Sequence, residues 1–185
     1  MRYRQEGGIV PTTDSPLPWY ALTVKHHHEK AVAQALCGRD VENYLPLYRS
    51  FHHSAGRKRA VDLPLFPGYV FCRLDVNRRL PVLMIPGVSA IVSVGRTPVP
   101  LPEEEIENVR AMVQSQLQVA PQPFLTAGQG VYIDRGPLQG IQGTLVGSKG
   151  EYRLIVAIEL LQRAVSAEVD IAWVRPADAS GLKAA

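Results

Sequence analysis

The sequence predicts an α+β domain followed by a small all-β domain that resembles an SH3-like barrel. Three observations carry this prediction. Short apolar runs bounded by Pro and Gly alternate with helical patterns up to residue 117. A composition shift follows at residues 118–127, and only strand and turn signals come after residue 128. Helices flanking a mainly antiparallel sheet are typical of α+β folds, and closely spaced short strands are typical of small barrels.

Composition limits the classes of protein to which the chain can belong. The 185 residues are 46% hydrophobic and 20% charged, which provides a core and argues against wholesale disorder. Two cysteines without a CxxC pair predict reduced thiols, not a disulfide scaffold or a zinc site. No apolar run approaches the ~20 residues of a membrane span, and the N-terminus lacks a signal-peptide core. We therefore expect a cytoplasmic protein, and we expect it to be a monomer. We also expect a disordered leader at 1–18 and a frayed tail at 178–185.

The N-terminal elements follow from apolar runs and breakers. "WYALTV" reads as a buried strand, and the helix after it ends at Gly38, a natural stop. A second strand region covers 41–51, where Pro46 indicates an edge or a bulge. "HHSAGRKRA" reads as a loop whose hairpin tip is Ala55–Gly56, and a third strand covers 67–75.

The second half of this domain contains the clearest helix. A short helix or turn at 77–88 is broken by prolines, and a fourth strand covers 90–95. In "PEEEIENVRAMVQSQL" the three glutamates complement the positive end of the helix dipole. Its predicted apolar stripe comprises Ile106, Val109, Val113 and Leu117.

Residues 118–127 contain two prolines and no charge, and they read as a linker. The predicted domains are therefore 19–117 and 128–177. Within the second, "GVYIDRG", "TLVG", "EYRLIVAIEL" and "RAVSAEVD" indicate short strands. The last of them alternates as a strand does when one face is in water.

The sequence offers no convincing catalytic or metal site. It contains no GxSxG, Walker, GxGxxG or HExxH motif. The histidines at 26–28 and 52–53 are consecutive, so their side chains diverge and converge poorly on one ion. We therefore expect no enzyme activity, no metal and no cofactor.

A basic stretch runs from Arg49 to Arg59. It holds four cations, two histidines and no acid, and Tyr48 and Phe51 add aromatic rings. Positive charge on a protruding hairpin suits contact with phosphates, and aromatic neighbours suit stacking on bases. The alternative is an ordinary solvated loop.

The order of motifs resembles the NusG family of transcription elongation factors. "WYAL", "YLPLYRS", a basic loop, "LPLFPGYVF", "IPGVSAIVSVG" and a "PxxEIE" helix follow one another as in its N-terminal domain. "GQGVYIDRGPLQGIQGTLV" resembles the KOW motif of its second domain, where Gly136 and Gly140 permit a tight loop and Gly143 permits close strand packing. The resemblance covers residues 19–176. The motifs are more similar to those of RfaH-like or UpxY-like antiterminators than to those of housekeeping NusG.

The resemblance implies that the first domain binds RNA polymerase and favours processive elongation or antitermination. Breakers beside aromatics in "LPLFPGYVF" suggest an apolar hollow at which Phe66 and Tyr69 are partly presented. The alternative is that one or both rings pack against the sheet. The residues implied to contact the clamp helices of the β′ subunit are Tyr20, Leu65, Phe66, Pro67 and Tyr69. The β gate loop is implied to contact Arg78, Arg79 and Leu80, which stand where related paralogues carry His-Thr-Thr.

Further partners are implied for both domains. Specialised members read the exposed non-template DNA strand, and the matching cationic candidates are Lys25, His26, Arg49, Arg57, Lys58 and Arg59. The KOW domain of the family recruits a small-subunit ribosomal protein or the termination factor Rho. The corresponding loop contains Ile158, Leu160, Leu161 and Arg163. The alternative function is that of a KOW-type RNA-binding protein of the ribosome, which would usually be far more basic than the net charge of +3.

Overall fold

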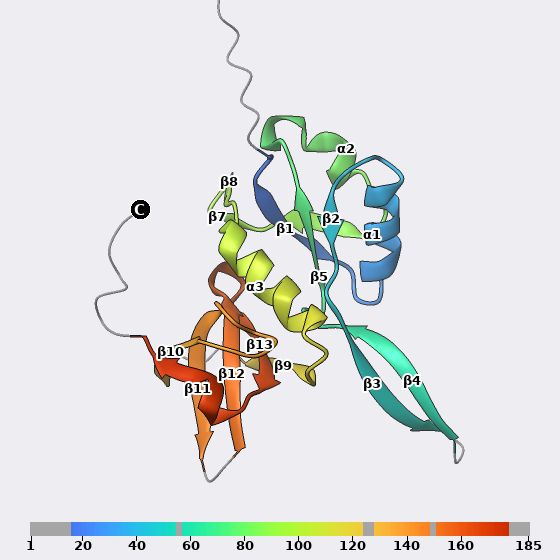
Figure 1. Cartoon of the computed structure of the whole chain (residues 1–185). Coiled ribbons are helices and arrows are strands. Elements are labelled where there is room, and N and C mark those ends of the chain that lie inside the picture. Colours follow the sequence, from blue (N-terminus) through green and yellow to red (C-terminus); the bar gives the residue numbers. More distant parts are fainter. Residues whose placement is uncertain (1–15, 55–56, 124–127, 149–150, 178–185) are drawn as a thin grey trace, which may run out of the picture.

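A four-stranded antiparallel sheet forms the centre of the N-terminal domain (Figure 1). The computed structural model describes residues 16–54, 57–123, 128–148 and 151–177. The sheet has the strand order β2-β5-β1-β6, with bounds Asn43–Tyr44, Tyr69–Arg73, Trp19–Val24 and Val88–Ile91. The helices and 3-10 turns of this domain are α1 (Glu29–Cys37), η1 (Val76–Arg78), α2 (Leu80–Leu83) and α3 (Glu103–Gln114). The predicted mixed α+β class is confirmed.

Strand β1 is buried on both faces because its side chains alternate between two cores. Leu22 packs with Val32 and Leu36 of α1. Trp19 and Ala21 belong to the other core, together with three buried residues of α3, Ile106, Val109 and Met112. The two helices therefore cover opposite faces of the sheet.

The predicted stripe of α3 was wrong in its second half. Met112 is fully buried, whereas Val113 is only partly buried and Leu117 lies beyond the end of the helix. The helix ends because Ser115 Oγ bonds to the Met112 carbonyl at 2.7 Å and Gln116 adopts a positive φ of 63°.

A long β-hairpin replaces the loop expected at residues 52–60. Strands β3 (Leu47–Ser54) and β4 (Arg57–Pro64) pair over all eight residues of each and extend away from the domain (Figure 1). The expected single strand over 41–51 is instead divided at Pro46 between β2 and β3, which belong to different sheets. Similarly, β6 ends at Ile91, and a small hairpin follows with strands β7 (Ser93–Val94) and β8 (Thr97–Pro98).

The C-terminal sheet has six strands in the order β14-β10-β11-β12-β13-β9. Their bounds are Val174–Pro176, Gln129–Ile133, Gln142–Ser148, Glu151–Ile158, Arg163–Glu168 and Val119–Pro123, with η2 at Glu159–Leu161 and η3 at Ile171–Trp173. The strand β9 corrects the predicted linker, because residues 119–123 pair with β13. Its two prolines fit the end of the strand order, where fewer backbone N–H groups are needed. Residues 1–15, 124–127 and 178–185 lie outside the described residues.

Helix α3 lies between the N-terminal sheet and the C-terminal sheet (Figure 1). One hydrophobic cluster runs continuously from Trp19 and Phe71 through α3 to Val131, Leu154 and other residues of the C-terminal sheet. The two domains therefore share a core. No helix in the described residues is long and apolar enough to cross a membrane.

Candidate functional site

The segment "LPLFPGYVF" forms a tight turn between β4 and β5. The Tyr69 N–H donates to the Phe66 carbonyl at 3.1 Å. Pro67 and Gly68 occupy the central positions, and Gly68 has a φ of +84°, the pattern of a type II turn. The Gly68 N–H donates to Glu29 Oε1 at 2.8 Å, so the start of α1 holds the turn in place.

The turn exposes fewer of its side chains than expected. Phe66 is 1% exposed and meets Phe71 edge to face with ring centroids 5.4 Å apart. The prediction that the Phe66 ring is partly presented was therefore wrong. Leu65 is likewise buried, Pro67 is exposed and Tyr69 is partly buried.

The structure does not bring Tyr20 together with the other predicted polymerase contacts. Tyr20 is 5% exposed and belongs to the core beneath α1, whereas Leu65 and Phe66 belong to the core beneath α3. Their polymerase-binding role remains a prediction.

A groove of about 770 Å³ lies at the base of the hairpin. It runs between β3–β4 and the end of α3, and its lining includes Leu47, Tyr48, Arg49, Val113 and Leu117. Tyr48, which lines the groove, pairs across the hairpin with Leu63, the first residue of the "LPLFPGYVF" segment. Sequence reasoning missed Tyr48 as an apolar wall and counted it only as a possible base-stacking ring.

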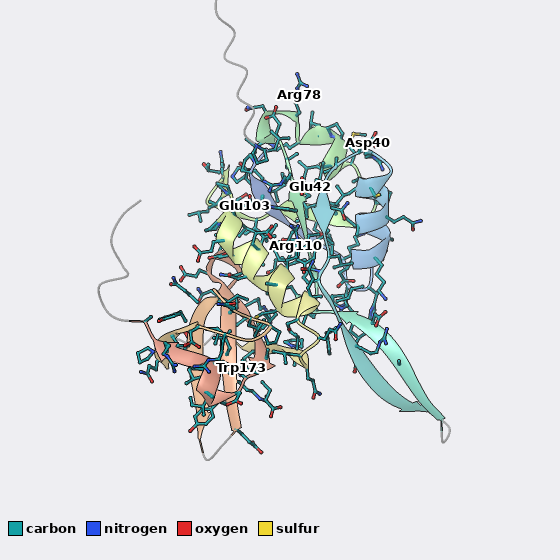
Figure 2. The ribbon with its side chains drawn as sticks, viewed as in Figure 1. Asp40, Glu42, Arg78, Glu103, Arg110 and Trp173 are labelled. Atoms are coloured by element: carbon teal, nitrogen blue, oxygen red, sulfur yellow. The ribbon has the colours of Figure 1, made fainter. Side chains whose placement is uncertain are left out.

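The predicted gate-loop contacts lie at the opposite end of β5 from Pro67. Arg78, Arg79 and Leu80 are all exposed, and the Leu80 side chain is 69% exposed. Met84, four residues further, is 78% exposed and was missed by sequence reasoning. The i, i+4 spacing of Leu80 and Met84 was the available signal. Figure 2 shows Arg78 at the end of the molecule away from Trp173.

The predicted nucleic-acid residues come from two neighbouring elements. Lys25 and His26 are exposed in the connection before α1, where the His26 and His27 rings lie 3.8 Å apart. Lys30 of α1 donates through Nζ to the Asp62 carbonyl at 2.8 Å. This bond links α1 to the hairpin and identifies Lys30 as a further cation near the predicted surface.

The hairpin is less free of acid than the sequence suggested. Arg49 forms an exposed ion pair with Asp62 at 3.4 Å, because the two residues are partners in the strand register. Asp62 lies three residues beyond the stretch that contained no acid. Arg57, Lys58 and Arg59 belong to β4, opposite Ser54, His53 and His52, but their side chains lie outside the described residues.

The predicted partner loop of the C-terminal domain contacts α3. Ile158 and Leu161 are buried, Leu160 is partly buried and packs on the shared core, and Arg163 is exposed. The Glu159 N–H lies 3.4 Å from Glu105 Oε1 of α3. Burial raises the pKa of Glu105, whose Oε2 atom has no partner among the described residues.

A polar cluster fastens the N-terminal sheet to the start of α3. Arg73 contacts Glu42 and Glu103, and its guanidinium lies 4.7 Å from the centre of the Trp19 ring. Trp19 Nε1 donates to Glu103 Oε1 at 3.1 Å. Arg110 lies over the rings of both Trp19 and Tyr44. These paired groups serve packing, because each charge already has a partner.

The described residues provide little support for a nucleophilic or metal site. Burial raises the pKa of the Cys72 thiol to about 12, so it remains protonated and a poor nucleophile. No group of three or more His, Cys, Asp or Glu side chains in the described ranges could hold a metal ion.

Comparison with known proteins gives a consistent result. Residues 17–110 match the family model described as transcription termination factor nusG. The transcription termination/antitermination protein NusG of Helicobacter pylori strain J99 is 24% identical over 149 residues, covering 74% of this chain and 85% of that protein. Its counterpart in Thermus thermophilus is 27% identical over 130 residues, covering 64% of this chain and 71% of that protein.

A solved structure concerning domain interaction in Thermotoga maritima NusG shares the fold. The TM-score is 0.53 at 20% identity, and the match covers 87% of this chain and 97% of that chain. Because the match spans both parts of the chain, the likeness of fold extends to the C-terminal sheet.

Proposed function

Because the chain belongs to the NusG family, we propose that it is a transcription elongation and antitermination factor that binds RNA polymerase through residues 19–117. Proteins of this family are transcription factors. The observation that carries the proposal is the groove of about 770 Å³ at the base of the protruding hairpin, where Leu47, Tyr48, Val113 and Leu117 provide apolar lining. Such a groove suits the tip of a helical hairpin, as resemblance to the family implies for the β′ clamp helices.

Mechanistically, the factor would act by binding and not by bond chemistry. A protein that binds the closed, processive form of polymerase more tightly than the paused form shifts the population toward elongation. The surface at Arg78, Arg79 and Leu80 would contact the β subunit from the far end of β5. Binding at two separated points would hold both sides of the polymerase cleft. We propose that the factor acts in the cytoplasm and uses no cofactor.

We propose that residues 128–177 recruit a ribosomal protein or Rho and that the factor is a specialised, RfaH-like or UpxY-like paralogue. The predicted recruiting loop contains Ile158, Leu160, Leu161 and Arg163. Because this loop contacts α3, a partner would compete with α3 for it.

Polymerase binding tests the groove directly. A Tyr48→Ala/Tyr69→Ala double variant should bind core RNA polymerase at least about tenfold more weakly in a pull-down titration. Tyr48 lines the groove, Tyr69 is a partly buried ring of the turn, and large aromatic side chains dominate interfaces. Tyr132→Ala is the matched control, since Tyr132 is 41% exposed on the C-terminal sheet. Unaltered binding by the double variant would show that the groove is not the contact. Failure of the unaltered protein to bind polymerase would contradict the proposed function.

The hairpin cations test the DNA contact. The triple change Arg57→Glu/Lys58→Glu/Arg59→Glu should weaken binding of single-stranded DNA in the polymerase complex. It should also lower the slope of log affinity against log salt by about 2, since each phosphate contact contributes roughly 0.7. The matched control reverses three exposed cations elsewhere, Arg39, Arg135 and Arg153. An equal salt slope in the hairpin variant and the unaltered protein would remove the hairpin from the DNA surface.

A further inference from the structure

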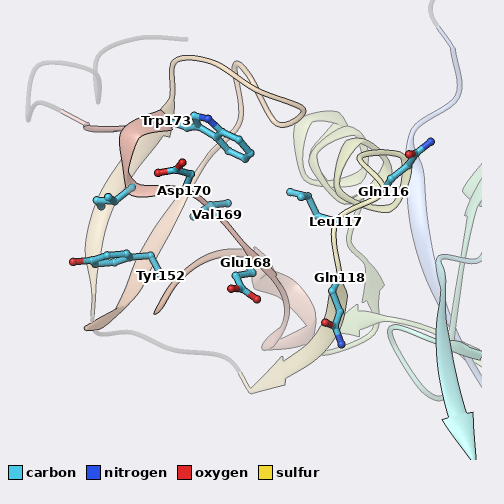
Figure 3. A pocket seen from close by; sticks show the side chains of 9 residues that line it. Gln116, Leu117, Gln118, Tyr152, Glu168, Val169, Asp170 and Trp173 are labelled. Atoms are coloured by element: carbon cyan, nitrogen blue, oxygen red, sulfur yellow. The ribbon is translucent and has the colours of Figure 1, made fainter. Parts of the chain in front are cut away.

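A second groove opens where the connection between α3 and β9 passes the C-terminal sheet (Figure 3). It has a volume of about 500 Å³. One wall is formed by Gln116, Leu117 and Gln118 of the connection. The other wall comes from Tyr152, from Glu168 at the end of β13, and from the segment that follows, namely Val169, Asp170, Ile171 and Trp173.

The groove offers apolar surface that the fold leaves uncovered. Leu117, Tyr152 and Trp173 are partly buried, and Ile171 is 47% exposed. Leu117 is held in position because its N–H donates to Ser115 Oγ at 3.3 Å. An aliphatic chain could therefore lie between two aromatic side chains and a leucine.

The charged groups of the groove are both acidic. Glu168 and Asp170 are exposed, and Val169 between them is buried, so alternation along the extended backbone turns both carboxylates outward. Neither forms an ion pair with another described residue, although Arg153 stands opposite Glu168 in the strand register. Asp170 Oδ1 accepts the Ala172 N–H at 2.9 Å, which fixes this carboxylate before any ligand arrives. The groove is thus negative on a chain of net charge +3.

We propose that this groove binds a basic segment of a partner protein through an arginine side chain. The guanidinium meets Glu168 and Asp170, and the aliphatic stem lies against Leu117 and the aromatic side chains. Arginine fits better than lysine because its planar group stacks on rings and bonds carboxylates in pairs. Nucleic acid does not fit, since two carboxylates repel phosphates. The inference does not depend on polymerase binding.

The test uses the full chain and a labelled nine-residue peptide of alternating arginine and leucine. Peptides with glutamate or serine in place of arginine serve as probes of charge. The unaltered protein should bind the arginine peptide, and Glu168→Gln/Asp170→Asn should weaken binding at least about tenfold, because charge-assisted hydrogen bonds are the strong ones. Asparagine can still accept the Ala172 N–H, so the local fold is kept.

The control variant, Glu104→Gln/Glu151→Gln, removes the same charge at exposed positions outside the groove. It should retain nearly the full affinity. Equal weakening in both variants would reveal general charge attraction and overturn the proposal. Any of three further results would also overturn the proposal. The first is that the peptide changes amide NMR chemical shifts at residues outside the groove. The others are equally tight binding of the serine peptide and binding of a thymidine oligonucleotide at the groove residues.

Discussion

Replacing Phe66 by alanine should lower the free energy of unfolding by about 3–5 kcal/mol. The ring is 1% exposed and lies edge to face with Phe71, within the core that also contains α3. Removing it leaves a cavity beside Phe71 that the neighbouring backbone cannot easily close. Urea denaturation monitored by circular dichroism would measure the loss as a lower midpoint with an unchanged slope.

Phe66→Leu is the appropriate comparison, because it keeps most of the buried volume. It should cost clearly less than the alanine change. A loss below about 1 kcal/mol in Phe66→Ala would mean that the ring is not a core residue in solution. The expected result also affects functional tests, since lost polymerase binding in Phe66→Ala would reflect unfolding as readily as a lost contact. Tyr48 and Tyr69 are the better positions for that purpose.

Gly143→Ala should destabilise the C-terminal sheet by about 1–3 kcal/mol. A Cβ atom at this position would stand 2.5 Å from the Ile155 carbonyl oxygen and 3.0 Å from Leu154 Cδ1. The first of these atoms belongs to the backbone of the neighbouring strand β12, so a side-chain rotation cannot relieve the clash. Thermal unfolding of the full chain should show a lower midpoint, with earlier loss of tryptophan fluorescence from Trp173.

Gly130→Ala provides the matched control on the neighbouring strand β10. Its Cβ would meet only Ala177 Cβ, at 3.9 Å, which is an ordinary contact. This variant should unfold at nearly the same temperature as the unaltered protein. Equal stability of both alanine variants would show that β11 and β12 are less closely apposed than the structure describes.

Elements encoded locally could be predicted from the sequence. The run "WYALTV" is largely apolar on both faces, which predicts a buried strand. The glutamates before an apolar stripe predict the start of α3. The Pro67–Gly68 pair predicts a sharp turn. Proline fixes φ at the value that the first central position of a type II turn requires, and glycine readily adopts the positive φ of the second. The close-packing role expected for Gly143 is confirmed by the position of Ile155.

Features that depend on distant residues could not be predicted in this way. β9 forms because β13 offers unpaired backbone groups. The residues "VAPQP" themselves contain no signal that predicts pairing with β13. The burial of Phe66 depends on α3, about forty residues later, and the pairing of Arg49 with Asp62 depends on hairpin register. The groove beside Trp173 likewise exists only because the connection after α3 passes the C-terminal sheet.

The incorporation of residues 119–123 into the C-terminal sheet shortens the tether between the two domains. Only residues 115–118 separate the end of α3 from the first strand of that sheet. Four residues span at most about 14 Å when fully extended, whereas the ten residues of the predicted linker would have spanned about 35 Å. A protein captured by the second domain would therefore be held within a small radius of whatever the first domain binds. Its effective local concentration there would be set by geometry, with little need for high affinity.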